Sequence, residues 1–467
     1  MTTLSTSVAE ALRDALGADG LLTDPSECLG YGYDNSRRHA MPQAVALPTT
    51  IAHVQAIVRI CRDARLPIVA RGRGTNTTGA SVPVDGGVVV SFERMDRILA
   101  IRPADRVAIV EPGVLNGALQ DAAAEHGFFW PPDPTSAPYC TVGGNLACNA
   151  GGPRAVKYGA TRDNVLALAF VDGRGDLIRC GAPTTKGASG YDLTRFMVGS
   201  EGTLGLIVEA TLKLVPKPEA RRSLRALYRD VDTAAAAVAR LMSQPVAPSM
   251  LEFMDAGCVR LARDVLRQAQ DERGFGIPEA GALLMIETDG PATTLDHAVT
   301  ALSQAARGDG LIALDVAPDE AAREALWSAR KALSPALRTL APGKINEDVV
   351  VPVSAIPALV KRVGEIAASV ALPILTFGHA GNGNLHVNIL YDPDDADQAA
   401  RAERGMDALF DAVLALDGQL SGEHGIGIAK RAYMSRALPP ATLALMRAIK
   451  AQFDPDGLLN PGKLLPQ

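Results

Sequence analysis

The hydrophobic pattern of the first half of the chain changes between helical and strand spacing. Apolar residues at intervals of three and four predict amphipathic helices, and runs of β-branched residues bounded by turn residues predict strands. The predicted helices are 4–16, 51–66 and 115–125, and the predicted strands are 67–70, 88–92, 107–110, 166–171, 177–179 and 204–215. Pro216 and Pro218 end the last strand, so we place a domain boundary there.

From residue 220 the pattern starts again, with strands that alternate with Ala-rich helices. The predicted strands are 223–228, 282–288, 311–316, 347–353 and 373–377, and the predicted helices are 231–243, 320–340 and 357–370, with a tail helix from 440 that stops at Asp454-Pro455. This mixture predicts an antiparallel sheet backed by helices, in an α+β protein. The predicted domains are 1–218, 219–420 and a C-terminal segment, 421–467.

A further strand is expected near residue 385, and its polar face is unusual. If the apolar residues within 385–389 form the buried face, the period of two places Asn384, His386 and Asn388 together on the other face. His379 precedes this strand and is separated from it by a Gly-Asn-Gly turn. A strand face with two amides and an imidazole indicates a polar cavity.

A second motif follows in Ser421-Gly-Glu423-His424-Gly-Ile-Gly. Glu423 and His424 are adjacent and point in different directions, so one can bind a metal while the other transfers a proton. With two more histidines, a glutamate supplies three ligands and leaves a position open, as zinc, manganese or ferrous iron sites require. The alternative is that each histidine is a hydrogen-bonded structural residue.

Composition narrows the range of partners. The 467 residues are 47% apolar, the net charge is −6 and no basic run occurs, which argues against nucleic acid. The six cysteines all lie at or before Cys258 and form no C-x-x-C pair, so we expect free thiols and no iron–sulfur cluster. The chain shows no signal peptide and no apolar run of about eighteen residues, so we expect a cytoplasmic protein; peripheral contact with a membrane stays open.

Three glycine-rich segments in the first half are candidates for nucleotide binding. No G-x-G-x-x-G motif joins a strand to a helix, which argues against a Rossmann domain. Instead, one loop over 71–79 follows a predicted strand, and two more cover 141–152 and 199–205. Successive backbone amides in such loops form anion-binding nests.

These motifs, in this order, resemble those of the flavin-dependent D-2-hydroxyacid dehydrogenases. That family includes D-lactate dehydrogenase, the glycolate oxidase flavin subunit and D-2-hydroxyglutarate dehydrogenase, and belongs to the vanillyl-alcohol oxidase superfamily. The resemblance runs from about residue 30 to residue 465 and rests on the three loops, Gly190-Tyr-Asp-Leu and the two histidine motifs.

The resemblance implies an N-terminal domain of two α/β subdomains that holds FAD, a domain that caps the flavin, and a C-terminal segment that returns to it. Some relatives attach FAD through a histidine of the first loop, but residues 70–82 contain none, so non-covalent FAD is expected. The implied cofactor residues are Arg71, Gly72, Arg73, Gly74, Thr75, Asn76, Gly79, Ala80, Pro132, Asp133, Thr141, Val142, Gly143, Gly144, Asn145, Cys148, Asn149, Gly151, Gly152, Tyr158, Gly159, Glu201, Gly202, Gly205, Ile207 and Asn460.

The resemblance also assigns the chemistry. His379, His386 and Glu423 match the family's metal ligands, with zinc favoured over manganese or iron, and His424 matches the base that takes the hydroxyl proton while hydride passes to FAD. Arg330, on one helical face with Trp327 and Ser334, matches a position that binds the substrate carboxylate. The implied substrate residues are Arg330, Ser334, Lys344, Asn346 and Asn388.

The expected reaction is oxidation of a D-2-hydroxy acid to the 2-keto acid, with D-lactate ahead of D-2-hydroxyglutarate and glycolate. The expected electron acceptor is a quinone, a cytochrome or an electron-transfer flavoprotein, and a homodimer stays open. Two alternatives remain: a flavin-fold transferase like the alkyl ether lipid synthase, and a non-catalytic flavin subunit of a larger oxidase.

Overall fold

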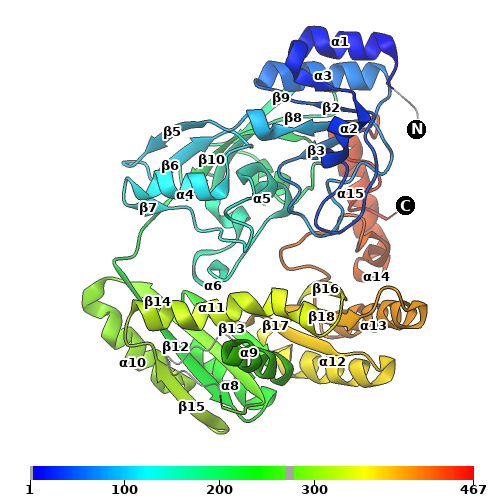
Figure 1. The fold of residues 1–467 in the computed structure, drawn as a ribbon. Coiled ribbons are helices and arrows are strands. Elements are labelled where there is room, and N and C mark those ends of the chain that lie inside the picture. The colour runs from blue at the N-terminus through cyan, green and yellow to red at the C-terminus, as the bar shows by residue number, and fades with distance from the viewer. Residues whose placement is uncertain (1–3, 269–277, 467) are drawn as a thin grey trace. The chain divides into compact units, whose positions relative to one another are not determined.

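A computed structural model describes residues 4–268 and 278–466. The chain forms two compact units, drawn in Figure 1. The first contains Met1–Gly152, Gly159–Lys217 and Glu423–Gln467, and the second contains Pro153–Tyr158 and Pro218–Gly422. The second unit is therefore inserted, in sequence, between the main part of the first unit and its C-terminal segment.

The first sheet of the first unit has the strand order β1-β2-β4-β3, in which β2, β4 and β3 are parallel. Its strands are β1 (Leu21–Leu22), β2 (Ala44–Ala46), β3 (Ile68–Arg71) and β4 (Val88–Ser91). The helices α1 (Thr6–Leu16) and α3 (Ile51–Asp63) share one apolar cluster with this sheet. The Thr50 hydroxyl caps α3 by accepting a hydrogen bond from the His53 amide, and Val54, Ile57 and Val58 are buried, as the helical spacing predicts.

The second sheet of this unit is antiparallel, in the order β5-β6-β10-β8-β9. Its strands are β5 (Ile98–Arg102), β6 (Val107–Val110), β8 (Val165–Val171), β9 (Leu177–Gly181) and β10 (Leu206–Lys213), and β7 (Phe128–Phe129) pairs with β11 (Val215–Pro216). The other helices of the first unit are α2 (Pro25–Cys28), α4 (Asn116–Ala124), α5 (Val142–Cys148), α7 (Leu193–Met197), α14 (Met434–Ala437) and α15 (Pro440–Phe453).

The C-terminal tail returns to the first sheet. The Ile68 amide donates to the Leu458 carbonyl at 2.8 Å, and the Asn460 amide donates to the Ile68 carbonyl at 2.7 Å. Residues near the end of the chain thus extend the edge of β3 in parallel. As predicted, the tail helix α15 stops directly before Asp454.

The second unit is built on one antiparallel sheet in the order β15-β12-β14-β13-β17-β18-β16. Its strands are β12 (Ala220–Tyr228), β13 (Met250–Asp255), β14 (Ala282–Gly290), β15 (Leu311–Val316), β16 (Gly343–Val350), β17 (Ile374–His379) and β18 (Asn384–Tyr391). The prediction of an antiparallel sheet backed by helices is confirmed. The order of the strands could not be read from their spacing.

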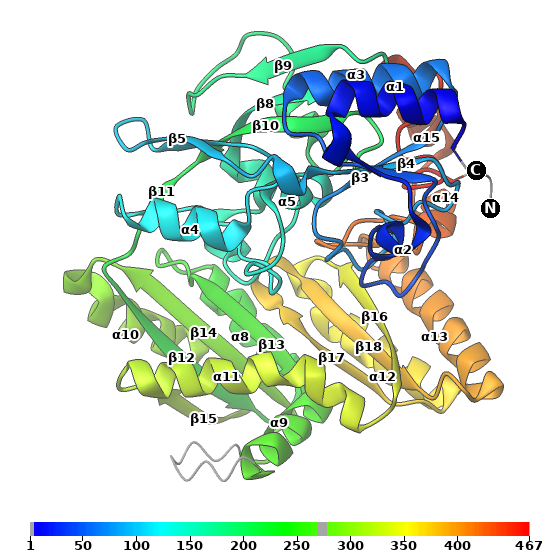
Figure 2. The same ribbon diagram turned by 45° about the horizontal axis from the view of Figure 1, so that its top comes forward.

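Helices cover both faces of this sheet. One face packs against α9 (Ala256–Gln268) and α11 (Glu320–Ala336), and Figure 2 shows α11 crossing the sheet. The other face carries α8 (Val231–Met242), α10 (Leu295–Ala306), α12 (Ile356–Val370) and α13 (Ala396–Ala415), while α6 (Ala155–Tyr158) contacts β13. The Tyr228 hydroxyl donates to the Ala306 carbonyl at 2.7 Å and so ties the sheet to α10.

The sequence pattern missed several elements of this unit. The strand β13 and the helices α9, α10 and α13 were not predicted, and β16 begins at Gly343 rather than at 347. The polar residues at the start of β16, such as Lys344 and Asn346, hide its alternation, although it pairs fully with β18. Among the described residues no helix is long and apolar enough to cross a membrane, and all six cysteines are free thiols.

Replacing Leu333 by alanine tests how much the packing of α11 contributes to stability. Leu333 is fully buried in the cluster between α11, α9 and the sheet, so its truncation leaves a cavity. We expect the free energy of unfolding to fall by about 2–5 kcal/mol, measured by urea denaturation. Leu340→Ala is the matched control, because Leu340 is 50% exposed, and should cost less than about 0.5 kcal/mol. Equal losses in both variants would contradict this assignment.

Candidate functional site

The three glycine-rich loops of the first unit meet beside β3. The first loop, 71–79, contacts the second through Asn76, whose amide nitrogen lies 3.4 Å from Cys148 Sγ. The third loop joins them where the Glu201 amide donates to the Ala147 carbonyl at 2.9 Å. Segments far apart in the sequence therefore border one region of this unit.

Asn460 ties the C-terminal tail to the same loops. Its side-chain amide is buried and donates to the carbonyls of Ala80 at 2.9 Å and Glu201 at 2.6 Å. The ammonium of Lys463 donates to Asn460 Oδ1 at 3.1 Å, and burial lowers the pKa of Lys463 to about 8, although the charge of Asp85 opposes this shift. The tail is thus part of the loop region, as the resemblance implies.

Two glycines let these loops approach closely. A Cβ atom on Gly72 would lie 2.4 Å from Thr141 Oγ1, the atom that caps α5 by accepting from the Gly144 amide at 3.1 Å. Gly79 has φ +82°, a left-handed conformation that residues with side chains rarely adopt. Backbone amides can therefore approach a pyrophosphate without a side chain in between, so the loops fit the FAD that they are predicted to hold.

Arg71 and Tyr158, both expected at the cofactor, bind protein groups. The Arg71 guanidinium donates to the carbonyls of Tyr33 at 2.6 Å and Gly30 at 3.2 Å. The Tyr158 hydroxyl belongs to the second unit and lies 2.9 Å from both carboxylate oxygens of Asp289. Burial, followed by the charge of Asp289, raises the pKa of Tyr158 well above its ordinary value. Their predicted contacts with a cofactor stay predictions.

Within the first unit, the segment that carries Glu423 and His424 is held by two of the loops. Asn76 Nδ2 donates to the His424 carbonyl at 3.0 Å. The Glu201 carboxylate accepts from the backbone amides of residues 426–427 at 2.6 and 2.8 Å. Burial raises the pKa of Glu201 to about 7, although these two amides oppose the shift. Glu201 is predicted to line the cofactor, and its role in fixing this segment carries no local signal in the sequence.

In the second unit, one sheet face carries a row of polar residues. His379 on β17 pairs in register with Glu252 on β13 and with Asn384 on β18. Further along β18, His386 lies opposite Asp348 on β16. Directly paired residues project to the same side of a sheet, so these five side chains share one face. The predicted alternation along β18 is therefore present.

Glu252 was not singled out in the sequence, yet it lies between two expected site residues. It is 1% exposed; its Oε2 accepts from Arg330 Nε at 2.8 Å, and its Oε1 contacts His379 Nδ1. Burial alone would raise the pKa of Glu252, but the charges and hydrogen bonds of His379 and Arg330 lower it well below its ordinary value. Arg330 also lies 4.4 Å from the centroid of the Phe377 ring.

Asp348 is a second carboxylate that the sequence analysis missed. It is completely buried and accepts hydrogen bonds from Asn384 Nδ2 at 2.5 Å, Ser421 Oγ at 2.7 Å and the Gly422 amide at 2.9 Å. The last two bonds hold the chain to β16 directly before Glu423. Asp348 thereby fixes the point from which the predicted catalytic motif continues.

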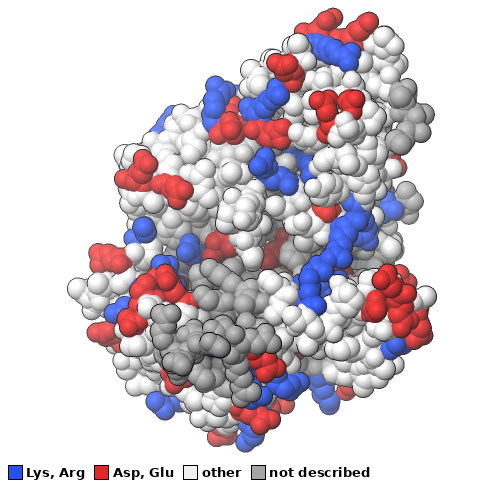
Figure 3. Space-filling model, in the orientation of Figure 1, with Lys and Arg blue, Asp and Glu red and all other residues white. Residues whose placement is uncertain are grey.

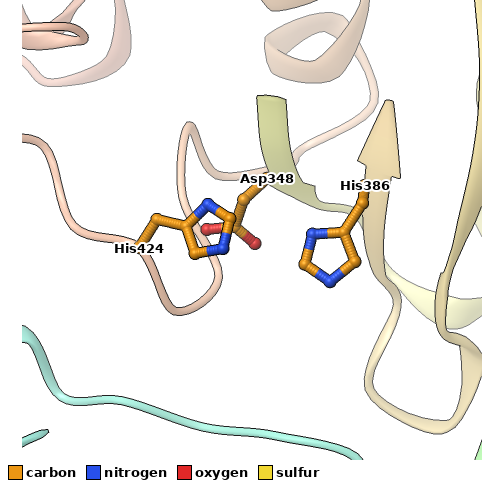
Figure 4. A group of neighbouring side chains, drawn as sticks. All are labelled: Asp348, His386 and His424. Carbon is orange, nitrogen blue, oxygen red and sulfur yellow. The ribbon is translucent and has the colours of Figure 1, made fainter. Parts of the chain in front are cut away.

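The second unit carries side chains that could hold a metal ion. His379 and His386 each offer a ring nitrogen, and these atoms lie within 4.8 Å of each other. Asp348 and His386, which Figure 4 draws, have the same spacing. Glu423 and His424, the other expected residues of this site, belong to the first unit. The rings of His379 and His386 stand edge to face, with centroids 5.3 Å apart. Nitrogen and carboxylate donors at this spacing fit a divalent transition metal.

The remaining expected substrate residues differ in their hydrogen bonding: some of their polar atoms bind protein groups, and others have no partner. Lys344 donates to Ser334 Oγ at 2.9 Å, which joins β16 to α11. Asn388 is fully buried and its Nδ2 donates to the His386 carbonyl at 3.1 Å. Within the described residues, Asn346 Oδ1 and Asn388 Oδ1 are buried without a hydrogen-bond partner. Such unpaired acceptors are costly, so a bound hydroxyl would be a favourable partner.

Comparison with known families now defines the class of protein. The family model described as FAD binding domain matches residues 42–181, and the model described as FAD linked oxidases, C-terminal domain, matches residues 217–464. The chain belongs to the FAD-linked oxidases, and the resemblance noted from its motifs is confirmed.

Individual relatives share most of their length with this chain. The glycolate oxidase subunit GlcD of Bacillus subtilis (strain 168) is 39% identical, over 99% of this chain and 97% of the relative. The D-lactate dehydrogenase of Anaerostipes hadrus is 34% identical, over 91% and 90%. The D-2-hydroxyglutarate dehydrogenase of Stutzerimonas stutzeri (strain A1501) is 33% identical, over 98% of each chain.

Solved structures show the same fold at low identity. p-Cresol methylhydroxylase with bound substrate gives a TM-score of 0.78 at 19% identity, over 98% of this chain and 96% of that structure. Alkyldihydroxyacetonephosphate synthase gives 0.74 at 20% identity, over 99% and 86%. The predicted architecture of the vanillyl-alcohol oxidase type is confirmed, and because such likeness concerns the fold alone, the chemistry must be argued from the site.

The substitution Glu201→Gln tests whether burial raises the pKa of this carboxyl group, through the pH dependence of the free energy of unfolding. A carboxyl group whose pKa is about 7 when folded and 4.5 when unfolded takes up a proton on folding, so its presence costs stability as the pH rises through that interval. In flavin-free protein, we expect the free energy of unfolding of the wild type to fall relative to the variant by roughly 2–3 kcal/mol between about pH 4.5 and pH 7. Chemical denaturation at several pH values measures this difference.

Glu209→Gln is the control for this experiment, because Glu209 lies on β10 and forms a surface ion pair with Arg179 at 3.0 Å. Its stability should follow the wild type across the pH range within about 0.5 kcal/mol. A flat difference between wild type and Glu201→Gln would show that Glu201 has an ordinary pKa.

Proposed function

We propose that this chain is an FAD- and metal-dependent dehydrogenase of small D-2-hydroxy acids. One observation carries the proposal: His379 and His386 lie at metal-ligand spacing on one sheet face, in a chain of the FAD-linked oxidase family that also contains the Glu423-His424 motif. D-Lactate remains the first substrate to test. Glycolate joins it, because the relative from Bacillus subtilis is named a glycolate oxidase subunit, and D-2-hydroxyglutarate follows.

His379, His386 and Glu423 would hold the metal, with zinc favoured and manganese or iron as alternatives. A bound divalent ion would polarise the substrate hydroxyl and lower its pKa. Because these ligands are two nitrogens and a carboxylate, they leave open coordination positions for the substrate. Asp348 supports this arrangement by holding residues 421–422 directly before Glu423.

His424 would act as the general base. Its backbone carbonyl is held by Asn76, so the motif has a defined position within the first unit. The imidazole takes the proton of the substrate hydroxyl, and the hydroxyl oxygen becomes the keto oxygen. Bound FAD would accept the Cα hydrogen with its two electrons. The product is the 2-keto acid, with the hydroxyl proton on His424 and the Cα hydrogen and two electrons on FAD.

Arg330 would bind the substrate carboxylate. Its guanidinium is planar and 13% exposed, and it is oriented by Glu252 and by the ring of Phe377. A guanidinium that is already fixed loses less entropy when it binds a second carboxylate. Ser334 and Lys344 are joined by a hydrogen bond of 2.9 Å and would also contact the substrate. Asn346 would accept a hydrogen bond from the substrate with its unpaired Oδ1.

The electron acceptor would be a quinone, a cytochrome or an electron-transfer flavoprotein, since the six cysteines provide no iron–sulfur motif. Acidic and basic side chains are interspersed on the face drawn in Figure 3. Together with the net charge of −6, this does not favour nucleic acid as a partner. FAD would be non-covalent, because residues 70–82 contain no histidine.

Anaerobic reduction of the flavin tests the reaction. Mixing the purified protein with D-lactate or glycolate, without an added acceptor, should bleach the flavin absorbance in the wild type. His424→Asn should slow bleaching by about 10²–10⁴-fold, because the proton acceptor is lost, while the flavin content stays unchanged. His53→Asn is the control, since His53 lies in α3 and contacts Thr49.

This experiment separates the alternatives. A transferase with the same fold would not be bleached by a hydroxy acid, and a non-catalytic flavin subunit would show no turnover with an artificial dye acceptor. Bleaching at the same rate in His424→Asn and in the wild type would remove His424 from the mechanism.

Removal of the metal tests the second part of the proposal. Dialysis against a chelator should abolish dye reduction with D-lactate while the flavin spectrum persists, because the ion is needed to activate the hydroxyl. Zn²⁺ or Mn²⁺ should restore activity in the wild type and not in His386→Ala. Full activity in protein shown to be metal-free by elemental analysis would contradict the metal role.

A further inference from the structure

Glu252 contacts two residues of the proposed site with one carboxylate. It lies on β13, directly opposite His379 on β17. One of its oxygens contacts His379 Nδ1, and the other accepts from Arg330 Nε at 2.8 Å and Nη2 at 2.6 Å. All three side chains belong to the second unit, and all are at most 13% exposed. The carboxylate is thus shielded from water and shared between an imidazole and a guanidinium.

A second buried carboxylate, Glu287, also pairs with an arginine of α11 but contacts no histidine among the described residues, so it can be compared with Glu252. Glu287, on the adjacent strand β14, is also buried and pairs with Arg323 of the same helix α11, at 3.2 Å. Its other partner is the hydroxyl of Ser223, at 2.9 Å. Both pairs fasten α11 to the sheet. Only the bond to His379 connects Glu252 to a residue that is proposed to bind metal.

A carboxylate at Nδ1 determines which nitrogen of the histidine can coordinate a metal. A neutral imidazole carries its proton on one nitrogen and a lone pair on the other. A carboxylate accepts hydrogen bonds only, so the proton of His379 belongs on Nδ1, beside Glu252. The lone pair is then on Nε2. The contacts of His379 with the carboxylate and with the His386 ring also restrict rotation of the imidazole.

We propose that Glu252 is a positioning residue that fixes the tautomer and orientation of His379 for metal binding through Nε2, and that also orients Arg330. This inference rests on the proposed metal site. It assigns to Glu252 no contact with substrate or cofactor. Outer carboxylates that hold a metal-ligating histidine typically strengthen metal binding 10–100-fold.

The substitution Glu252→Gln is a sharp probe, because the amide cannot replace both bonds. His379 Nδ1–H and the Arg330 guanidinium are both donors, and a glutamine side chain has a single acceptor oxygen. Either the histidine or the arginine must therefore face an NH₂ group. Glu287→Gln is the matched control, since it neutralises an equally buried carboxylate paired with α11 without touching a proposed ligand.

The experiment measures Zn²⁺ affinity of metal-depleted, flavin-loaded protein by competition with a chromophoric chelator. We expect Glu252→Gln to bind Zn²⁺ about 10–100-fold more weakly than wild type, and Glu287→Gln to differ by less than about threefold. Flavin absorbance reports whether each variant is folded. Excess Zn²⁺ should return kcat of Glu252→Gln to within about threefold of wild type, because the three proposed ligands remain.

Three outcomes are distinguishable. Wild-type protein that binds no Zn²⁺ would overturn the proposed metal site, and the inference with it. Normal Zn²⁺ binding in wild type and in Glu252→Gln would overturn the inference alone. Equal weakening in Glu252→Gln and Glu287→Gln would do the same, because the effect would then come from destabilising α11.

A measurement on wild-type protein covers the case in which Glu252→Gln does not fold. The chain has seven histidines, so ¹⁵N-histidine labelling gives a small set of ring signals, and loss of one set in His379→Gln assigns His379. With Zn²⁺ bound we expect a protonated Nδ1 and an unprotonated Nε2. The opposite tautomer would overturn the inference.

Discussion

The cost of burying a carboxylate is the constraint on which this structure depends. A charge removed from water must be paired or hydrogen-bonded, and an uncompensated one is strongly destabilising. Glu201, Glu252 and Asp348 are all buried. Each is bonded to groups that lie far away in the sequence. Glu201 accepts hydrogen bonds from the backbone amides at 426–427, Glu252 contacts Arg330 on α11 and His379 on β17, and Asp348 accepts a hydrogen bond from the Gly422 amide. Their need for partners defines the positions of the groups that bind them.

This explains which parts of the site were visible in the sequence. The glycine-rich loops and the polar side of β18 stand out because glycine and alternating polarity are local signals. Glu252 and Asp348 do not, because each is a single carboxylate in a strand. What makes them important is the register, in which Glu252 faces His379 and Asp348 faces His386. The register of Glu252 with His379, 127 residues away, cannot be derived from spacing, and neither can that of Asp348 with His386, since α12 and β17 lie between them.

The same reasoning applies to the fold. Helices and strands with clear periodicity, such as α3 and β10, were predicted nearly to their ends. The helices α9, α10 and α13 were missed, because stretches in which alanine and charged residues are frequent give a weak apolar pattern until a sheet provides a surface to cover. Arg71 has a role that its place in a glycine-rich loop did not indicate, since its guanidinium holds the backbone at residues 30 and 33, while its predicted contact with the cofactor stays a prediction.

The path of the chain has a consequence for biosynthesis. The first unit is interrupted after Lys217 and is completed by the segment that begins at Glu423. The strand edge of β3 receives its partner from residues 458–460, which are made only after the whole inserted unit. On the ribosome the inserted unit, whose sheet is contiguous in sequence from β12 to β18, can assemble first. The N-terminal sheet must wait with one border incomplete until residues 458–460 have been made, and this interval is when nascent chains would most need protection from aggregation.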